Sequence, residues 1–300
     1  MKEIVIPKNV NMYAIRDVVI SFRKYSDDPD EDKKLIIDLT KVEFVQPSGV
    51  IALNNIIQWV MKHSGVDVGF RVTEEKSCVG RNRAAMEYLA DCGFFSSIGQ
   101  PKVFKNPKTR STMLSVKDLD TSKVEQWKVT DLKKWLQNQT GKRNEFTSVC
   151  TAIDEIFNNI SDHSQEKIGC IFGQYYPKNQ EIIIAVSDFG IGIPQSIKNK
   201  FKKTDADDEL IEFALGEGVS SQSIPQNRGA GLANIMKTLT TNSVGEFTII
   251  SNCGIVNIKN NIVNSSDVLE ESYPGTFFEI KIDTSNENLY DLDEEEEFEW

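Results

Sequence analysis

The sequence has few of the features that mark membrane proteins, metal proteins or disulfide-linked proteins. No apolar run reaches the ~18 residues that span a bilayer, and the first residues lack the apolar segment of a signal peptide. Two histidines, His63 and His163, are too few for a histidine-rich metal site. The five cysteines show no Cys-x-x-Cys spacing, which argues against zinc and against a disulfide framework. We therefore expect a cytoplasmic protein that does not enter a membrane.

An excess of basic residues is also missing. The net charge is −11, and eight acids with no base lie from residue 287 onward, so the rest of the chain carries only −3. A basic patch that binds nucleic acid is therefore not expected. Residues 285–300 predict a solvated acidic tail. Its apolar side chains leave a docking peptide open as an alternative: Leu289, Tyr290, Phe298 and Trp300.

What is present suffices for two globular domains: 300 residues, of which 39% are hydrophobic and 26% charged. In residues 1–100 the pattern strand–strand–helix–strand–helix predicts a small α/β domain. Residues 101–120 are polar and predict a linker. An amphipathic helix over 124–138 begins a second α/β domain at 121–284. Within it, segments 247–250 and 254–258 suggest a β-hairpin.

A helix predicted over 146–162 carries the first candidate site. Its apolar residues form one stripe, and Glu155 and Asn159 lie four apart on a different face. The Asn159 carbonyl can bind Mg2+, which takes only one or two protein ligands beside phosphate oxygens. The Glu155 carboxylate can orient a water or hydroxyl, or accept its proton. A polar helix face without chemistry explains this segment alone equally well.

Two glycine-rich segments follow the helix. The strand 181–187 ends at Asp188, and Gly190 and Gly192 come directly after it, where they allow backbone to approach a flat ligand. The Asp188 carboxylate can accept a hydrogen bond from an adenine amino group. Further on, the segment Arg228–Leu232 precedes a helix, where glycine amides and the helix dipole favour phosphates. Each segment alone is also compatible with an ordinary tight turn.

A turn entering a strand, 273–282, completes an ordered set of four motifs that resembles the GHKL nucleotide-binding fold. Gyrase B subunits, mismatch-repair ATPases, sensor histidine kinases and anti-sigma-factor serine kinases share that fold. The resemblance covers roughly residues 124–283. It implies an α/β sandwich with a mixed sheet and helices on one face, ATP and Mg2+ as ligands, and a lid at 195–227.

The resemblance also implies roles for single residues. Glu155 would be the catalytic carboxylate, Asn159 the Mg2+ ligand and Asp188 the acceptor for the adenine amino group. Gly190 and Gly192 would shape the base pocket. The other positions implied near phosphate or base are Asn158, Arg228, Gly229, Gly231, Leu232 and Thr276.

The first domain resembles STAS domains, the fold of anti-sigma-factor antagonists. The similarity lies in residues 35–53, where a buried strand is followed by Gln46-Pro47-Ser48-Gly49 and a helix. In phosphorylated STAS domains the residue before the glycine is the phosphoacceptor, which corresponds to Ser48. The chain departs from the family by Gln46-Pro47 where Asp-Ser is usual. From the residues alone we expect Ser48 to cap the helix.

Together the two resemblances imply a cytoplasmic signalling regulator, a serine/threonine protein kinase or partner-switching factor of the anti-sigma kinase type that acts on a protein partner. Two alternatives stay open. One is an ATPase whose nucleotide state gates dimerisation or partner binding, and the other is a module that binds ATP without turnover. An autophosphorylating histidine kinase is not expected, because His63 and His163 do not lie in a separate acceptor hairpin.

Overall fold

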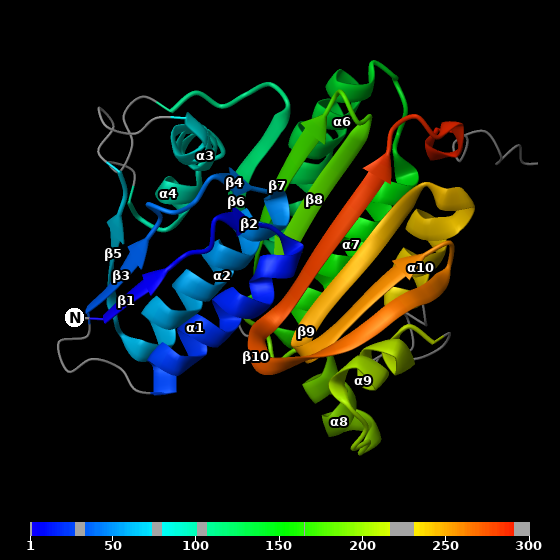
Figure 1. Cartoon of the computed structure of the whole chain (residues 1–300). Coiled ribbons are helices and arrows are strands. Elements are labelled where there is room, and N and C mark those ends of the chain that lie inside the picture. The colour runs from blue at the N-terminus through cyan, green and yellow to red at the C-terminus, as the bar shows by residue number, and fades with distance from the viewer. Residues whose placement is uncertain are drawn as a thin grey trace, which may run out of the picture.

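The computed structural model describes residues 2–27, 34–73, 80–100, 107–164, 166–216 and 231–290. It is a mixed α/β structure, as expected, built around two separate sheets (Figure 1). The first sheet is parallel, in the order β1-β3-β5, and a short parallel pair, β2-β4, lies beside it. The strands are β1 (Lys2–Val5), β2 (Asn9–Val10), β3 (Lys34–Asp38), β4 (Phe44–Val45) and β5 (Asp67–Arg71). The helices of this part are α1 (Ile15–Asp27), α2 (Pro47–Ser64), α3 (Gly80–Asp91) and α4 (Phe94–Ser97).

Helix α2 is the central element of the first domain. Pro47 occupies its first turn, and Gly65, with φ of 60°, ends it in the left-handed conformation. Most of its residues are buried, and they lie on all faces of the helix, which is typical of a helix enclosed within a core. Even so, among the described helices, α2 included, none is long and apolar enough to cross a membrane.

The second sheet has the order β6-β7-β8-β10-β9, and every neighbouring pair in it is antiparallel. Its strands are β6 (Met113–Asp120), β7 (Ile168–Tyr176), β8 (Glu181–Ser187), β9 (Gly245–Lys259) and β10 (Ile262–Asp283). The expectation of a mixed sheet is therefore wrong for the described strands. Short turns join β7 to β8 and β9 to β10, and such turns connect only antiparallel strands.

Three boundaries differ from the sequence prediction. Residues 113–120, expected in the linker, form β6, since Met113, Leu114 and Leu119 are buried against the sheet and its helices. Segments 247–250 and 254–258 do not form a hairpin but belong to the single strand β9, which bends where Asn252 adopts a φ of 49°. The expected tail begins late, because η6 (Glu287–Leu289) packs on the domain and buries Leu289. Residues 101–106 and 291–300 lie outside the described residues.

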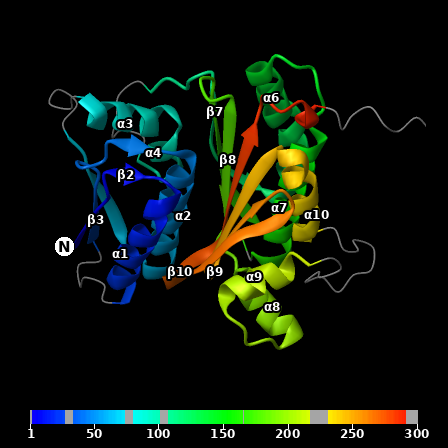
Figure 2. The same ribbon diagram turned by 45° about the vertical axis from the view of Figure 1, so that its right-hand side comes forward.

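Helices cover one face of the second sheet (Figure 2). They are α5 (Val124–Trp127), η3 (Lys128–Leu132), α6 (Lys133–Thr140), α7 (Thr147–His163) and α10 (Gly231–Thr240). The first three form one continuous helical segment with a π-helical turn in the middle, which confirms the helix predicted over 124–138. Helices α7 and α10 lie against each other over the sheet, and their buried residues share one core with it.

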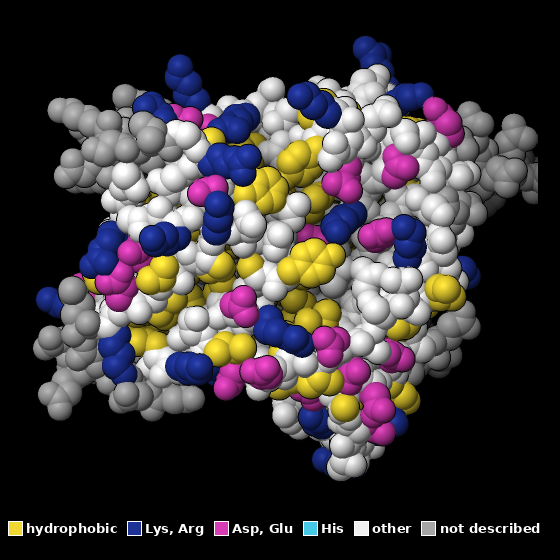
Figure 3. All heavy atoms as spheres, viewed as in Figure 1, with side chains coloured by type: hydrophobic (Ala, Val, Ile, Leu, Met, Phe, Trp, Pro, Cys, Tyr) yellow, Lys and Arg dark blue, Asp and Glu magenta, His cyan; other side chains and the backbone are white. Residues whose placement is uncertain are grey.

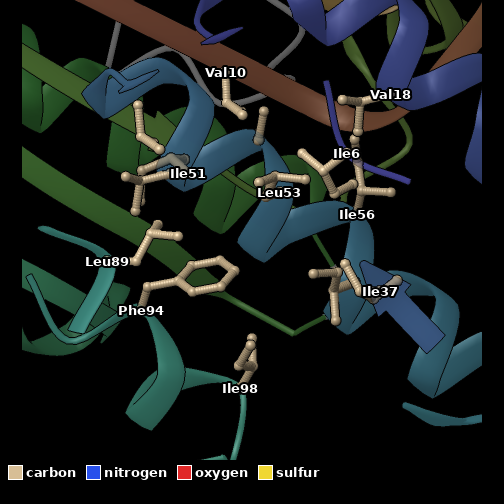
Figure 4. Packing of buried hydrophobic residues seen from close by; sticks show 14 of the residues in the cluster. Ile6, Val10, Val18, Ile37, Ile51, Leu53, Ile56, Leu89, Phe94 and Ile98 are labelled. Carbon is tan, nitrogen blue, oxygen red and sulfur yellow. The ribbon is translucent and has the colours of Figure 1, made fainter. Parts of the chain in front are cut away.

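The other face of the second sheet is covered by the first domain. Helices α1 and α2 pack against β7, β8 and β10, and one hydrophobic core runs from the first domain onto this face. Figure 4 shows Ile51 and Ile56 of α2 among side chains of the first domain such as Val18 and Leu89. The sheet residues that join this core are Met113, Cys170, Phe172, Ala185, Ile250, Leu269, Tyr273 and Phe277. The second sheet is therefore enclosed between the first domain and its own helices.

The rim of this domain interface is polar. Arg16 on α1 pairs with Asp267 on β10 at 2.9 Å, and the Arg23 side chain donates to the Ser272 carbonyl at 2.8 Å. A cleft of 710 Å3 opens between α1 and the β9–β10 hairpin. Figure 3 shows acidic and basic side chains mixed around exposed hydrophobic ones on this face. Apolar packing inside and ion pairs outside hold the two domains together.

Candidate nucleotide-binding site

The first group of candidate residues lies on α7, at the side that faces α10. The apolar stripe of α7 is buried, which leaves Glu155 and Asn159 at its flank, each partly exposed. The Asn159 amide nitrogen donates to the Glu155 backbone carbonyl at 2.9 Å. This bond fixes the amide so that its oxygen is the atom that remains for a cation. The role of Asn159 as a Mg2+ ligand stays a prediction.

The surroundings of Glu155 favour its carboxylate as a proton acceptor. Burial raises the pKa of its carboxyl, and Asp154 raises it further, whereas the side chain of Asn234 lowers it. Asn234, in the first turn of α10, places its amide nitrogen 3.4 Å from Glu155 Oε1. A carboxylate with a raised pKa is the better base at neutral pH.

The second group surrounds Asp188 at the end of β8. Asp188 is 5% exposed, and burial raises its pKa to about 7, although the Gly190 amide that donates to its carboxylate lowers it. Its backbone amide donates to the Thr276 carbonyl at 3.0 Å. Asp188 and Thr276, far apart in the chain, therefore lie together, while the contacts with adenine expected of them stay predictions.

Two glycines permit the close approach of backbone in this second group. Gly275 has a φ of 85°, and a Cβ there would lie 2.1 Å from the Asp188 carbonyl oxygen. Gly192, also at 85°, would bring a Cβ to 2.4 Å from Asn252 Oδ1. At Gly275 any other residue would push the turn away from the Asp188 backbone, whereas at Gly192 it would displace the Asn252 side chain on β9 and adopt a left-handed conformation. The two glycines thus set the shape of the turn, and the role of Gly192 beside a base stays a prediction.

Thr276 is held by a buried network of hydroxyl groups. Its Oγ1 lies 2.9 Å from Ser251 Oγ, and Ser251 Oγ accepts from the Ile193 amide at 2.8 Å. Ser187 Oγ donates to the Thr276 carbonyl at 2.9 Å. These bonds tie β8, β9, β10 and the start of α8 (Ile193–Phe201) together around Asp188.

Not every predicted residue joins these two groups. Asn158 is exposed on the other side of α7, where it lines a separate cleft of 510 Å3 with Asp154 and Lys167. Leu232 is buried in the core beneath α10, which gives it a packing role. Gly231 begins α10, while Arg228 and Gly229 lie outside the described residues. Within the described chain no hydrogen bond or ion pair links Glu155 or Asn159 to Asp188.

The expected lid is only partly described. Residues 193–201 and 207–214 form α8 and α9 (Asp207–Ala214), and Lys198 pairs with Asp207 at 2.6 Å between them. α9 packs so tightly on β9 that a Cβ at Gly254 would lie 2.7 Å from the Asp207 backbone. This half of the segment is a packed pair of helices and not a plain loop. Residues 217–227 lie outside the described residues.

Ser48 is buried in the domain interface. It occupies the second position of α2, not the cap, because Pro47 already fills the first position and Gln46 precedes it. The expected capping role is therefore wrong. The next position, Gly49, requires glycine, because a Cβ there would lie 2.2 Å from the Val10 carbonyl oxygen. The side chain of Ser48 faces Glu279 on β10, whose pKa is raised by burial and lowered by Lys281 and by the Ser48 hydroxyl.

Three residues that contribute to these groups were missed by sequence reasoning: Asn55, Asn234 and Ser251. Asn234 lies three residues after Gly231, so the glycine-rich start of this helix could have indicated Asn234 as a candidate residue. Asn55 and Ser251 carry no such signal, because their partners lie in distant parts of the chain.

Within the described residues, no three or more His, Cys, Asp or Glu side chains cluster closely enough to hold a metal ion. A Mg2+ ion held by one amide oxygen and by phosphates would not need such a cluster. Searches with protein-family models, among curated proteins and among solved structures gave no match. The interpretation of the site therefore depends on its own geometry.

Proposed function

We propose that the second domain binds ATP with Mg2+ and that the chain is a cytoplasmic signalling regulator, a protein kinase or partner-switching factor of the anti-sigma kinase type. The observation that carries the proposal is the buried Asp188 carboxylate, held beside Thr276 and the glycine turn at the end of β8. A buried carboxylate beside a glycine turn is suited to an exocyclic amino group and a flat base.

The residues present fit the ligand. Asp188 supplies the acceptor for the adenine amino group, and the amide oxygen of Asn159 would hold the metal ion. That ion would neutralise charge on the phosphates. Glu155, with its raised pKa, would take a proton from the hydroxyl of a substrate or from water.

The position of Ser48 bears on the choice between activities. Its side chain is fully buried between the domains, so it is not accessible as a phosphoacceptor in this arrangement. This favours a phosphoacceptor on another protein. An ATPase that gates dimerisation or partner binding remains the second candidate, because it needs Glu155 but no acceptor serine.

Incubation of the purified protein with γ-labelled ATP, with and without candidate partners, tests the proposal. Label on Ser or Thr of a partner supports the kinase. Free phosphate without labelled protein supports the ATPase, and retention of intact ATP supports a binding module. Peptide mass spectrometry of the same samples shows whether Ser48 carries phosphate. If calorimetry shows no binding of Mg-ATP, all three are excluded.

A further inference from the structure

One buried side chain of the first domain reaches the turn around Asp188 in the second. Asn55, on α2, is 1% exposed. Its amide nitrogen donates to the Asp188 carbonyl at 3.1 Å and to the Pro274 carbonyl at 3.0 Å. A buried amide nitrogen is costly unless it is hydrogen-bonded. The two N–H groups of Asn55 donate to two neighbouring carbonyls, which holds the side chain and both carbonyls in place.

The two acceptors belong to the segments that meet at the Asp188 turn. Asp188 directly follows β8, and Pro274 precedes the glycine that lies against the Asp188 carbonyl. The pairing of β8 with β10 ends at Ser187 and Phe277. Asn55 therefore supplies hydrogen bonds just beyond the point where the strand ladder stops. Without them, the carbonyls of Asp188 and Pro274 would lose a shared donor inside a closed core.

We propose that Asn55 is a positioning residue for Asp188, and that through it the first domain sets the preference of the second domain for adenine nucleotides. The inference rests on the proposed function for its ligand. The positioning of the Asp188 turn itself rests on the two hydrogen bonds alone.

A neighbouring residue provides a matched control. Asn54 is on the same helix, is equally buried, and also crosses the domain interface. Its amide nitrogen contacts Cys170 Sγ at 2.9 Å and Ser97 Oγ at 3.1 Å, not the Asp188 turn. Asn54→Ala and Asn55→Ala thus remove the same group from the same interface, but only the second removes contacts to the turn.

The test uses the full chain and two measurements. The first is amide hydrogen exchange without nucleotide, read at residues 188–192. Exchange there should increase in Asn55→Ala and stay close to wild type in Asn54→Ala. The second is the ratio of ATP affinity to inosine triphosphate affinity. Inosine lacks the amino group from which Asp188 would accept a hydrogen bond. That ratio should fall about tenfold in Asn55→Ala, the equivalent of one hydrogen bond, and remain unchanged in Asn54→Ala.

The ratio cancels a general loss of stability, because both nucleotides bind the same variant. Equal exchange at residues 188–192 in the two variants would overturn the inference, and so would an unchanged ratio in Asn55→Ala. If the wild type binds neither nucleotide while exchange still rises only in Asn55→Ala, the proposed function fails and the positioning of the turn stands.

Discussion

Asp188 shows how a single buried group links stability to function. Its carboxyl has a pKa of about 7 in the folded chain, raised by burial from an ordinary value near 4. Between these two values the folded state binds more protons than the unfolded state. The contribution of this residue to stability is therefore greatest at low pH and is lost as pH rises from about 4 to about 7.

Replacement of Asp188 by Asn removes the ionisable group and keeps the shape of the side chain. The free energy of unfolding of Asp188→Asn, relative to wild type, should therefore increase between pH 5 and pH 8 by about 3 kcal/mol at most, because only the range from pH 5 to about 7 lies below the pKa of the wild-type carboxyl. Urea unfolding at several pH values measures this difference. ATP affinity should fall in the same variant, because the amide nitrogen of Asn replaces one of the two carboxylate oxygens that could accept a hydrogen bond from the adenine amino group. A difference that does not change with pH would contradict the assigned pKa.

Glu155 and Asn159 lie side by side on α7 but have separable roles. Glu155→Gln should keep ATP bound and lower turnover by at least about 100-fold, since a general base contributes about 10²–10⁴-fold. Asn159→Ala should instead weaken binding of Mg-ATP and leave the free energy of unfolding nearly unchanged, because the side chain is partly exposed. Calorimetry and phosphate release distinguish the two. Full turnover in Glu155→Gln would remove this residue from the mechanism.

At the scale of elements, the start of α2 depends on how closely it approaches β2. A Cβ at Gly49 would lie 2.2 Å from the Val10 carbonyl oxygen, whereas nothing lies within 4 Å of a Cβ at Gly65, just beyond the other end of the helix. The serine–glycine pair that resembles a STAS phosphorylation turn therefore also has a packing explanation.

The two glycines allow a direct comparison. Gly49→Ala should destabilise the chain by about 2 kcal/mol or more, because backbone must move. Gly65→Ala should cost only about 1 kcal/mol, the penalty for a left-handed conformation with φ of 60°. Chemical denaturation of both variants measures the difference. Equal losses would show that α2 and β2 separate easily.

At the scale of the whole molecule, the two domains share a core. Phe172, Tyr273 and Phe277 of the second sheet are buried in the cluster that fills the first domain. Exposure of these side chains would accompany any separation of the domains. The chain is therefore expected to behave as one cooperative unit, although each part has its own sheet.

Thermal unfolding should accordingly show a single transition. Trp59 lies in the first domain, Trp127 and Trp135 lie in the second, and Trp300 lies in the predicted acidic tail, so a Trp59→Phe, Trp300→Phe variant confines the tryptophan fluorescence to the second domain. Its fluorescence midpoint should coincide with the far-ultraviolet circular dichroism midpoint. Two resolved midpoints would show that the shared core contributes little.

The candidate residues could be selected from the sequence because the patterns that mark them are local, although their roles stay predictions. The spacing of Glu155 and Asn159 on α7, the acid at the end of β8 and the glycines after it each follow from short-range geometry. Ser48 shows the limit of this reasoning. Its pattern was consistent with a cap, yet Pro47 shifted the start of the helix and the second domain covered the side chain.

The sequence by itself determined most of the helices and strands and the polar residues at their ends, though not β6 or the single strand β9, because periodicity and turn chemistry operate within a few residues. Only the tertiary structure decided which face of the second sheet is covered by the first domain, and hence that Asn55 meets Asp188, 133 positions away. Such contacts depend on how whole elements pack, and no short stretch of sequence contains both partners.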